Sequence, residues 1–431
     1  MAALSKSDYA HIIAILEEEL VPALGCTEPI AIAYAGAYAR SLLGGIPERV
    51  RVKSSGNMIK NVKSVIVPNS GNMTGIAAAV AIGIIGGDPD QKLEVLSGIT
   101  ESDIARAKDF LNTVPCTVEL LNSPASLHFI VELCKGADTV SVEIIHQHTN
   151  IVQALKNGQI VYAVPFDVES ANAALTDRSV LSVEKILTFA DTVPLDAVQP
   201  VLERQIDYNT RIAQEGMEHT YGINAGANLL AAAERDHAVT FKVRAQASAA
   251  AGSDARMSGC TLPVVTNSGS GNQGITASLP VIVFAQEHKL THEKLLRGLL
   301  VSNLLAIHQK TKIGRLSAYC GAVSAACGSG AAITYLSGGN YTQVCDTITN
   351  TLAVISGIIC DGAKPSCAAK IAASVDAAIN ASYLALEGRA FQGGDGIVKP
   401  TIEQTIAGVG TMAAKGMRET DKVILNIMLE D

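Results

Sequence analysis

Residues 116–148, CTVELLNSPASLHFIVELCKGADTVSVEIIHQH, decide the fold class of this chain. Three short runs within them, at 116–121, 127–134 and 139–146, are rich in β-branched residues and predict strands. The next segment, IVQALKNGQIVYAV, predicts a hairpin, because Asn-Gly favours a tight turn. After residue 180 a helical periodicity dominates to the end. The sequence therefore predicts an α+β fold, with a small mixed sheet unit packed on a larger all-helical unit.

The segments before this stretch alternate between helix and strand patterns. Residues 8–20 predict a helix, and Pro29 begins a second one that runs to about residue 43. Residues 49–72 alternate in the manner of strands and turns, and TGIAAAVAIGIIGG at 74–87 predicts a short apolar helix closed by paired glycines.

A chain of 431 residues is long for one domain, so we expect two structural units. The sheet unit is predicted at 45–165, and residues 1–44 together with 166–431 form the mainly helical catalytic unit. We expect the first helices to pack on the helical unit, because Cys26, in the break between them, has to lie near later cysteines. Aromatic residues make up only 4% and Trp is absent, so small residues should bring the helices close together.

Charge and cysteine content exclude several classes of protein. The net charge is −8 and the isoelectric point about 5.6, which does not suit a nucleic-acid partner. The first twenty residues lack the uninterrupted apolar core of a signal peptide. Nine cysteines, an odd number, argue against a secreted disulfide framework and favour the reducing cytoplasm.

A membrane protein is the next class to consider, because the mean hydropathy is +0.27 and residues 316–345 carry no charged side chain. That stretch is interrupted by Ser, Asn, Gln, Thr and several glycines, whereas a spanning helix wants about 20 predominantly apolar residues. A buried helix pair is the better interpretation.

Two glycine-rich stretches resemble one another. NSGNMTGI at 69–76 and NSGSGNQGI at 267–275 each follow a β-like apolar run and open an apolar helix. Glycines let backbone N–H groups turn toward a ligand, and a helix N-terminus favours an anion, so a carboxylate or phosphate could bind there. The alternative is that both are turns that cap helices. The candidate substrate-binding side chains are Asn72, Ser268, Asn272 and Gln273.

The cysteines fall into two settings. Cys116, Cys134 and Cys345 lie in apolar runs typical of core residues, whereas glycine or proline neighbours surround Cys26, Cys320, Cys360 and Cys367. The last two enclose the stretch CDGAKPSC, whose spacing is wrong both for a zinc knuckle and for a redox dithiol. Three soft thiolates that converge in a pocket favour iron–sulfur or zinc, and an iron with an open position can act as a Lewis acid.

Five motifs in combination resemble the L-cysteine desulfidase family over residues 8–428: GCTEPIAIAYA, NSGSGNQGI, RLSAYCGAVSAACGSGAA, CDGAKPSC and GMRETDKVIL. More distantly, the C-terminal half is similar to the α part of iron–sulfur L-serine dehydratases. The resemblance implies that the helical unit carries a [4Fe–4S] cluster held by Cys320, Cys360 and Cys367. It also implies α,β-elimination of L-cysteine, an amino-acid substrate, to pyruvate, ammonia and hydrogen sulfide.

Cys26 has no counterpart in the serine dehydratases, and its implied role is general base or extra ligand. We favour the base, because three later cysteines already supply the cluster. Cys26 stands just before a predicted helix start, which would lower its pKa and suit a proton acceptor. Lys364 would pair with the substrate carboxylate or stay solvated, and Asp361 would brace its loop through backbone N–H groups.

Three other functions stay open at this point. The nearest is an L-serine dehydratase of the same architecture. The second is a pyridoxal-phosphate lyase, in which Lys364 or Lys370 would form the Schiff base. The third is a binding protein whose glycine-rich loops hold a small anion. His146 and His148, on one predicted strand, could bind zinc but lack an evident third ligand, and the small-residue helices would suit a homodimer.

Overall fold

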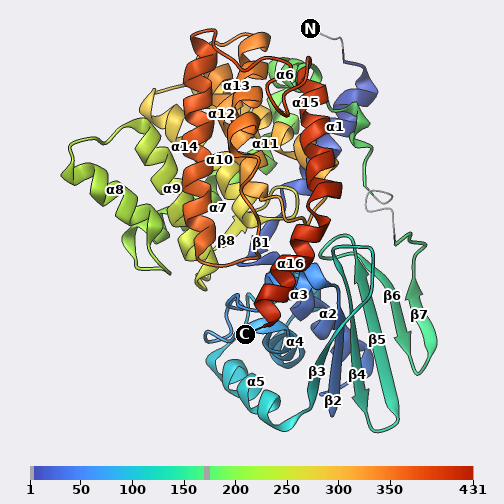
Figure 1. Cartoon of the computed structure of the whole chain (residues 1–431). Helices are drawn as coiled ribbons and strands as arrows, with labels where there is room; N and C mark the ends of the chain where they lie inside the picture. The colour runs from blue at the N-terminus through green and yellow to red at the C-terminus, as the bar shows by residue number, and fades with distance from the viewer. Residues whose placement is uncertain (1–3, 169–174, 431) are drawn as a thin grey trace.

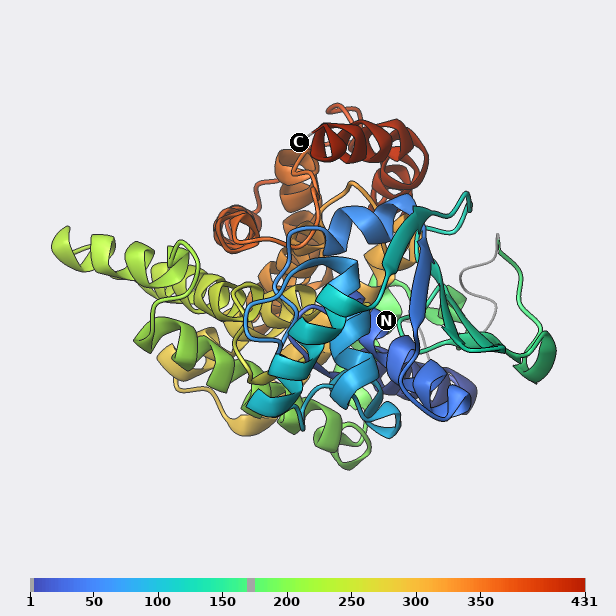
Figure 2. The same cartoon turned by 90° about the horizontal axis from the view of Figure 1, so that it is seen from below.

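The computed structural model describes residues 4–168 and 175–430. Figure 1 shows a sheet flanked by short helices at one end of the molecule and a bundle of long helices at the other. Seen from below, the sheet and the outlying helix α8 (Ala225–Arg235) lie at opposite sides (Figure 2). The predicted α+β class, a small mixed sheet with a larger helical region, is confirmed.

The sheet has six strands in the order β3-β2-β4-β5-β6-β7. Only β2 and β3 run parallel, and the other neighbours are antiparallel. The predicted hairpin is confirmed, since Asn157 and Gly158 both have positive φ and join the last two strands. The strands are β2 (Arg49–Ser54), β3 (Cys116–Leu120), β4 (His128–Lys135), β5 (Asp138–Ile145), β6 (Ile151–Lys156) and β7 (Gln159–Ala163).

Helices α2 (Thr27–Leu43), α3 (Gly56–Val62), α4 (Gly75–Gly86) and α5 (Glu101–Thr113) belong with the sheet. Their buried side chains share one hydrophobic core with the strands. The helix α3 was not predicted, because its seven residues stand inside a segment that reads as strands and turns. Helix α4 was predicted, and a Cβ on its Gly83 would lie 2.2 Å from the backbone oxygen of Ala33 in α2, so glycine is what allows these two helices to touch.

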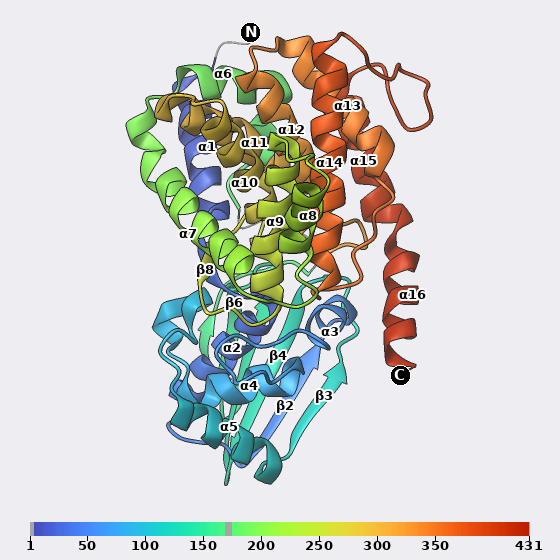
Figure 3. The ribbon, with the colours of Figure 1, turned by 90° about the vertical axis from the view of Figure 1, so that its left-hand side faces the viewer.

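The second core is helical. It is formed mainly by α1 (Lys6–Glu19), α6 (Val183–Thr192), α7 (Gln199–Glu218), α9 (Phe241–Met257), α10 (Gly271–Glu287), α11 (His292–Ile313), α12 (Gly321–Leu336), α13 (Tyr341–Ile355), α14 (Ser366–Leu386) and α15 (Ile402–Thr411). A final helix, α16 (Arg418–Leu429), leaves this bundle and runs beside α3 (Figure 3). Short 3-10 or π turns are η1 (Pro89–Glu94), η2 (Arg178–Val180), η3 (Leu195–Ala197) and η4 (Met412–Gly416).

The first two helices separate between the two cores. Helix α1 packs in the helical core, as predicted, whereas α2 packs with the sheet, so the expectation that both join the helical unit is wrong for α2. Its apolar residues fit the sheet because strands β4 and β5 offer it a flat apolar face. The strand β1 (Pro22–Leu24), between these helices, pairs with β8 (Pro263–Val265) and ties the two parts together. The predicted limits at 45 and 165 stay a prediction.

The uncharged stretch 316–345 supplies α12, which is buried in the bundle, and the start of α13, where Tyr341 is exposed. Among the described helices, none combines the length and the apolar character that crossing a bilayer requires.

Candidate active site

Cys320 and Cys360 lie on two short segments that pair side by side. The backbone N–H of Cys320 donates to the oxygen of Ile358 at 3.1 Å, and that of Cys360 donates to the oxygen of Ala318 at 2.7 Å. Cys320 then caps the N-terminus of α12, and Cys367 stands in the first turn of α14. These three thiols line one cavity of about 90 Å³, which we call the cysteine cavity.

A buried ion pair fixes the two paired segments. Lys60 of α3, 2% exposed, lies 2.5 Å from one carboxylate oxygen of Asp421 in α16 and donates to the backbone oxygen of Cys360 at 3.2 Å. The other carboxylate oxygen accepts from the N–H of Ala318 at 3.0 Å. Asp421, in the closing motif of the sequence, therefore holds both cysteine-bearing segments from outside.

Burial and neighbouring thiols disfavour the ionisation of Cys320 and Cys367. Burial, and after it the neighbouring Cys360 and Cys367, raise the pKa of Cys320 to about 12. Burial and Cys360 also raise the pKa of Cys367. Thiols in this state stay protonated at neutral pH until a metal displaces their protons.

The second glycine-rich stretch reaches this cavity. Asn272 and Gln273, in the first turn of α10, line it, as their predicted substrate-binding role requires. Gly321 lets α12 approach them, because a Cβ there would lie 2.5 Å from the side-chain amide carbon of Gln273. Ser268 donates to Asn267 at 2.9 Å and faces a neighbouring cavity instead. Asn72 is exposed and is not among the residues that line the cysteine cavity, so nothing here supports a substrate contact for it.

Cys26 also lines the cavity and caps α2, but its environment differs from the expectation. Its sulfur lies 3.1 Å from a carboxylate oxygen of Glu28 and donates to it. Burial and the charge of Glu28 raise the pKa of Cys26 well above its usual value, so the predicted lowering by the helix N-terminus is wrong. Burial alone would raise the pKa of Glu28, yet His148, the Cys26 hydrogen bond and Arg256 lower it, and Glu28 is ionised.

Cations outnumber carboxylates around the cysteine cavity. Arg256, Lys310 and Arg315 line it, whereas Glu28 is the single carboxylate among its described lining residues. Lys310 is 4% exposed, and burial lowers its pKa to about 8. Within the described part of the chain, its ammonium donates only a long 3.4 Å hydrogen bond, to the backbone oxygen of Arg315. This surplus of positive charge suits thiolates, a substrate carboxylate, or both.

Several buried polar groups at the cavity have no partner. Arg256 is 3% exposed, and among the described residues it makes no hydrogen bond or ion pair. Asn61, Asn272 and Gln273 each leave a buried amide oxygen without a donor. Since such groups cost about 1–3 kcal/mol each when unsatisfied, their gathering at one cavity indicates a polar ligand.

The donor set fits a cluster better than a single ion. Across residues 4–168 and 175–430, no group of three or more His, Cys, Asp or Glu side chains is arranged to hold one metal ion. A [4Fe–4S] cluster presents its irons at separate corners, so each thiolate binds a different iron and the sulfurs need not meet at one point. Three soft thiols around one cation-rich cavity fit that requirement.

The two lysines considered for a Schiff base lie outside this lining. Lys370 donates to Asp361 and to the backbone oxygen of Ile359, and Lys364 lies 3.7 Å from Asp361. Although burial alone would lower it, the contact with Asp361 raises the pKa of Lys370. Asp361 thus braces its loop through Lys364 and Lys370, and through a hydrogen bond with its own backbone N–H. Neither lysine is presented to a ligand in the cysteine cavity.

The histidines take other roles. Strand β5 ends at Ile145, so His146 and His148 stand in a turn and do not share a strand face. His146 contacts the backbone oxygen of Asp167 at 2.7 Å. His148 is buried beside Gly269 and Glu28, and burial lowers its pKa to about 4, so it is neutral. His308 pairs with Glu403 at 2.7 Å, away from the cysteine cavity.

Sequence reasoning missed the residues that surround the thiols: Glu28, Asn61, Arg256, Lys310 and Arg315. Two of them carried a signal. Glu28 stands two residues after Cys26 in GCTEP, and Arg256 is an isolated cation in the small-residue helix QASAAAGSDARM. The other three belong to segments whose approach to the cavity depends on tertiary packing.

Comparison with known proteins shows the family of this chain. The family model described as serine dehydratase alpha chain matches residues 90–426. The chain belongs to the serine dehydratase alpha chain family. It is similar over nearly its whole length to UPF0597 proteins, with 55% identity to one of Treponema denticola (99% of this chain, 100% of that protein) and 55% to one of Lachnoclostridium phytofermentans (98% and 100%). A UPF0597 protein of Shewanella oneidensis is 37% identical (99% and 100%). The predicted similarity to the serine dehydratase α part is confirmed, and family membership indicates a lyase.

Proposed function

We propose that this protein is an iron–sulfur lyase that splits L-cysteine into pyruvate, ammonia and hydrogen sulfide. The observation that supports it most is that Cys320, Cys360, Cys367, Cys26 and Arg256 line a single cavity. The five come from four different parts of the fold, so their meeting is not a consequence of chain proximity.

Cys320, Cys360 and Cys367 would hold a [4Fe–4S] cluster. When bound, the cluster supplies an open iron position that acts as a Lewis acid toward the substrate's β-sulfur. Lys310 and Arg315 balance the negative charge of the three thiolates, and the Lys60–Asp421 pair keeps the paired segments in place.

Arg256 is the group that would bind the substrate carboxylate, because it is buried, cationic and without a partner among the described residues. The free amide oxygens of Asn272 and Gln273 are placed to accept from the substrate ammonium. Together these contacts fix both ends of an α-amino acid and leave Cα between them.

Cys26 and Glu28 form the proton-transfer pair. The thiol proton of Cys26 already points to the Glu28 carboxylate, whose other oxygen accepts from Asn61 at 2.9 Å. Because the pKa of Cys26 is raised and that of Glu28 is lowered, the proton passes to Glu28 in only a small fraction of molecules, and in these the buried thiolate is a strong base. It removes the Cα proton, the electron pair forms the Cα–Cβ double bond, and hydrosulfide leaves. The 2-aminoacrylate then tautomerises and is hydrolysed to pyruvate and ammonia.

L-Serine dehydration on the same residues is the second candidate, and membership of the serine dehydratase alpha chain family favours it. The two reactions share every step except the leaving group, hydroxide in place of hydrosulfide. The anaerobically reconstituted protein should therefore be assayed with L-cysteine and with L-serine, and sulfide and pyruvate measured separately.

We expect sulfide and pyruvate in equal amounts from L-cysteine, with a kcat/KM at least about tenfold above that for L-serine. Cys26→Ser should abolish turnover and keep the iron, whereas Cys345→Ser, outside the cavity lining, serves as the matched control and should keep both. Preferential pyruvate formation from L-serine would replace this proposal by the dehydratase. Full turnover by an iron-free protein would reject both.

A further inference from the structure

Three cavities lie in a row between the thiols and the surface. Lys310 and Arg315 line both the cysteine cavity and a second one of about 70 Å³, the middle cavity. Leu175, Arg178 and Thr311 line both the middle cavity and a third of about 400 Å³, the outer cavity. Adjacent cavities therefore share their walls, and three of the five shared side chains are cations.

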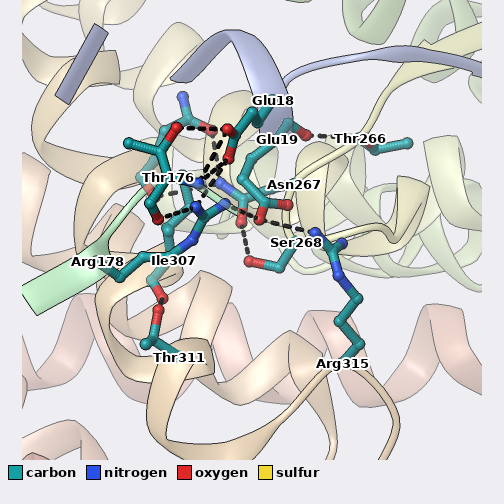
Figure 4. Close-up of polar contacts among 11 residues, drawn as sticks. Glu18, Glu19, Thr176, Arg178, Thr266, Asn267, Ser268, Ile307, Thr311 and Arg315 are labelled. Carbon is teal, nitrogen blue, oxygen red and sulfur yellow. Dashed lines mark hydrogen bonds and ion pairs between the residues drawn. The ribbon is translucent and has the colours of Figure 1, made fainter. Parts of the chain in front are cut away.

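Glu19 lines the middle cavity, and its two carboxylate oxygens differ in their partners. It is 4% exposed, and one carboxylate oxygen accepts from Arg178 at 2.8 Å and from Arg315 at 2.9 Å (Figure 4). Its other oxygen is buried and has no partner among the residues that the structure describes. The three groups come from the end of α1, from η2 and from the loop after α11, so their ion pairs join separate elements across the cavity.

This arrangement suits a zwitterion. A ligand carboxylate can replace Glu19 on one arginine at a time, so no guanidinium is left without a negative partner during the exchange. The free oxygen of Glu19 can accept from the ligand ammonium at the same place. Beyond Arg315 and Lys310 the next cation is the unpaired Arg256 in the cysteine cavity.

A fourth cavity, of about 430 Å³, lies along α16 and also borders the cysteine cavity. We call it the α16 cavity. The residues common to both are Leu316 and Ser317. Neither carries a charge, so an amino acid crossing there would lose the partners of both its ionic groups. The charged row is the less costly path.

We propose that small α-amino acids reach the cysteine cavity through this row of cavities, handed from Arg178 to Arg315 and Lys310 and then to Arg256, and that Glu19 keeps the passage closed until a carboxylate competes for its arginines. The proposal rests on the proposed function for the identity of the substrate. It assigns Glu19, Arg178 and Thr311 to access, away from the reacting atoms.

Thr311→Trp tests the passage, because residue 311 lines both the middle and the outer cavity. An obstruction slows entry and exit alike, so it lowers kcat/KM without changing the equilibrium affinity for a small carboxylate. We expect the reconstituted variant to lose about tenfold or more in kcat/KM for L-cysteine, with the Kd for pyruvate, measured by calorimetry, within about twofold of wild type. Asn57→Trp in the α16 cavity is the matched control and should keep both values.

Glu19→Gln supplies an independent arm should residue 311 prove intolerant. Removing the charge of Glu19 frees Arg315, whereas Arg178 keeps its ion pair with Glu18 at 2.7 Å. Inhibition by pyruvate should therefore become at least about threefold stronger. Unchanged kcat/KM in Thr311→Trp, or unchanged pyruvate inhibition in Glu19→Gln, overturns the passage. A loss of kcat/KM in Asn57→Trp alone assigns access to the α16 cavity. If the wild type releases no sulfide, the proposed function has failed. The rates at which the same variants bind pyruvate then still test whether ligands enter through the row of cavities.

Discussion

Replacing Lys310 by methionine should stabilise the protein that carries no cluster. The ammonium of Lys310 is buried, and its one hydrogen bond to a described residue is a 3.4 Å contact with the backbone oxygen of Arg315. Burial lowers its pKa from 10.5 to about 8. That shift means that burying the charged lysine lowers the free energy of unfolding by about 3 kcal/mol at pH 7. Methionine has a similar length and no charge, so Lys310→Met should recover most of that free energy.

The pH dependence of this gain follows from which state holds the proton. Below pH 8 both the folded and the unfolded protein keep Lys310 charged, so the full destabilisation is present. Between pH 8 and 10.5 the folded protein releases the proton first, and the stability of the wild type rises. The advantage of Lys310→Met should therefore shrink from about 3 kcal/mol at pH 7 to about 1 kcal/mol or less at pH 10.

Urea unfolding of the iron-free proteins at pH 7 and pH 10 measures this difference. Lys312→Met, at an exposed position on the same helix, is the control and should change stability by no more than about 0.5 kcal/mol. Equal stability of Lys310→Met and wild type at pH 7, or a gain that does not depend on pH, would refute the reasoning. The same variant should lose iron faster after reconstitution, because the cavity that holds the three thiolates then keeps two of its three cations.

Three further changes test other parts of the site. Arg256→Gln should lower kcat/KM for the amino acid by about 10- to 100-fold, mainly through a higher KM, because a charge-assisted contact with the carboxylate is lost. A normal KM would show that Arg256 does not bind the substrate. Asp421→Asn should at least roughly triple the rate at which a chelator extracts iron while the folded fraction by circular dichroism stays unchanged, because Asp421 accepts from Ala318 and holds Lys60, which donates to Cys360. An unchanged rate would contradict the positioning role. The stability of the wild type should fall by about 3 kcal/mol from pH 6.5 to pH 4, since the unfolded state protonates His148 over that range and the folded state does not; His148→Gln should lack this part of the fall in urea titrations, and an identical pH profile would exclude the assignment.

The strands and most helices could be predicted because their signals are local. The β-branched runs, the Asn-Gly turn and the glycine-terminated helix at 74–87 each depend on a few consecutive residues. The helix α3 could not be found in this way, since seven residues are too few for a clear period. The placement of α2 on the sheet was missed for another reason: an apolar helix fits either core, and only the whole fold decides between them.

The thiols of the site could be predicted because their motifs are compact, whereas the charges around them could not. Cys320 and Cys360 are separated by forty residues, yet each stands in a distinctive segment. Lys310, Arg315 and Asn61 stand in ordinary helix or loop sequence, and their burial at the cavity is a product of packing between α2, α3, α10 and α11. The raised pKa of Cys26 depends first on its burial, which GCTEP does not reveal, and then on Glu28, whose proximity is visible there.

Iron and acid-labile sulfide, counted after anaerobic reconstitution, test the central claim most directly. We expect about four of each per chain in the wild type and in Cys345→Ser. Cys320→Ser, Cys360→Ser and Cys367→Ser should each retain less than about half of that amount, since every one of them removes a ligand. Full occupancy in all three serine variants, or a wild type that binds no iron, would contradict the account.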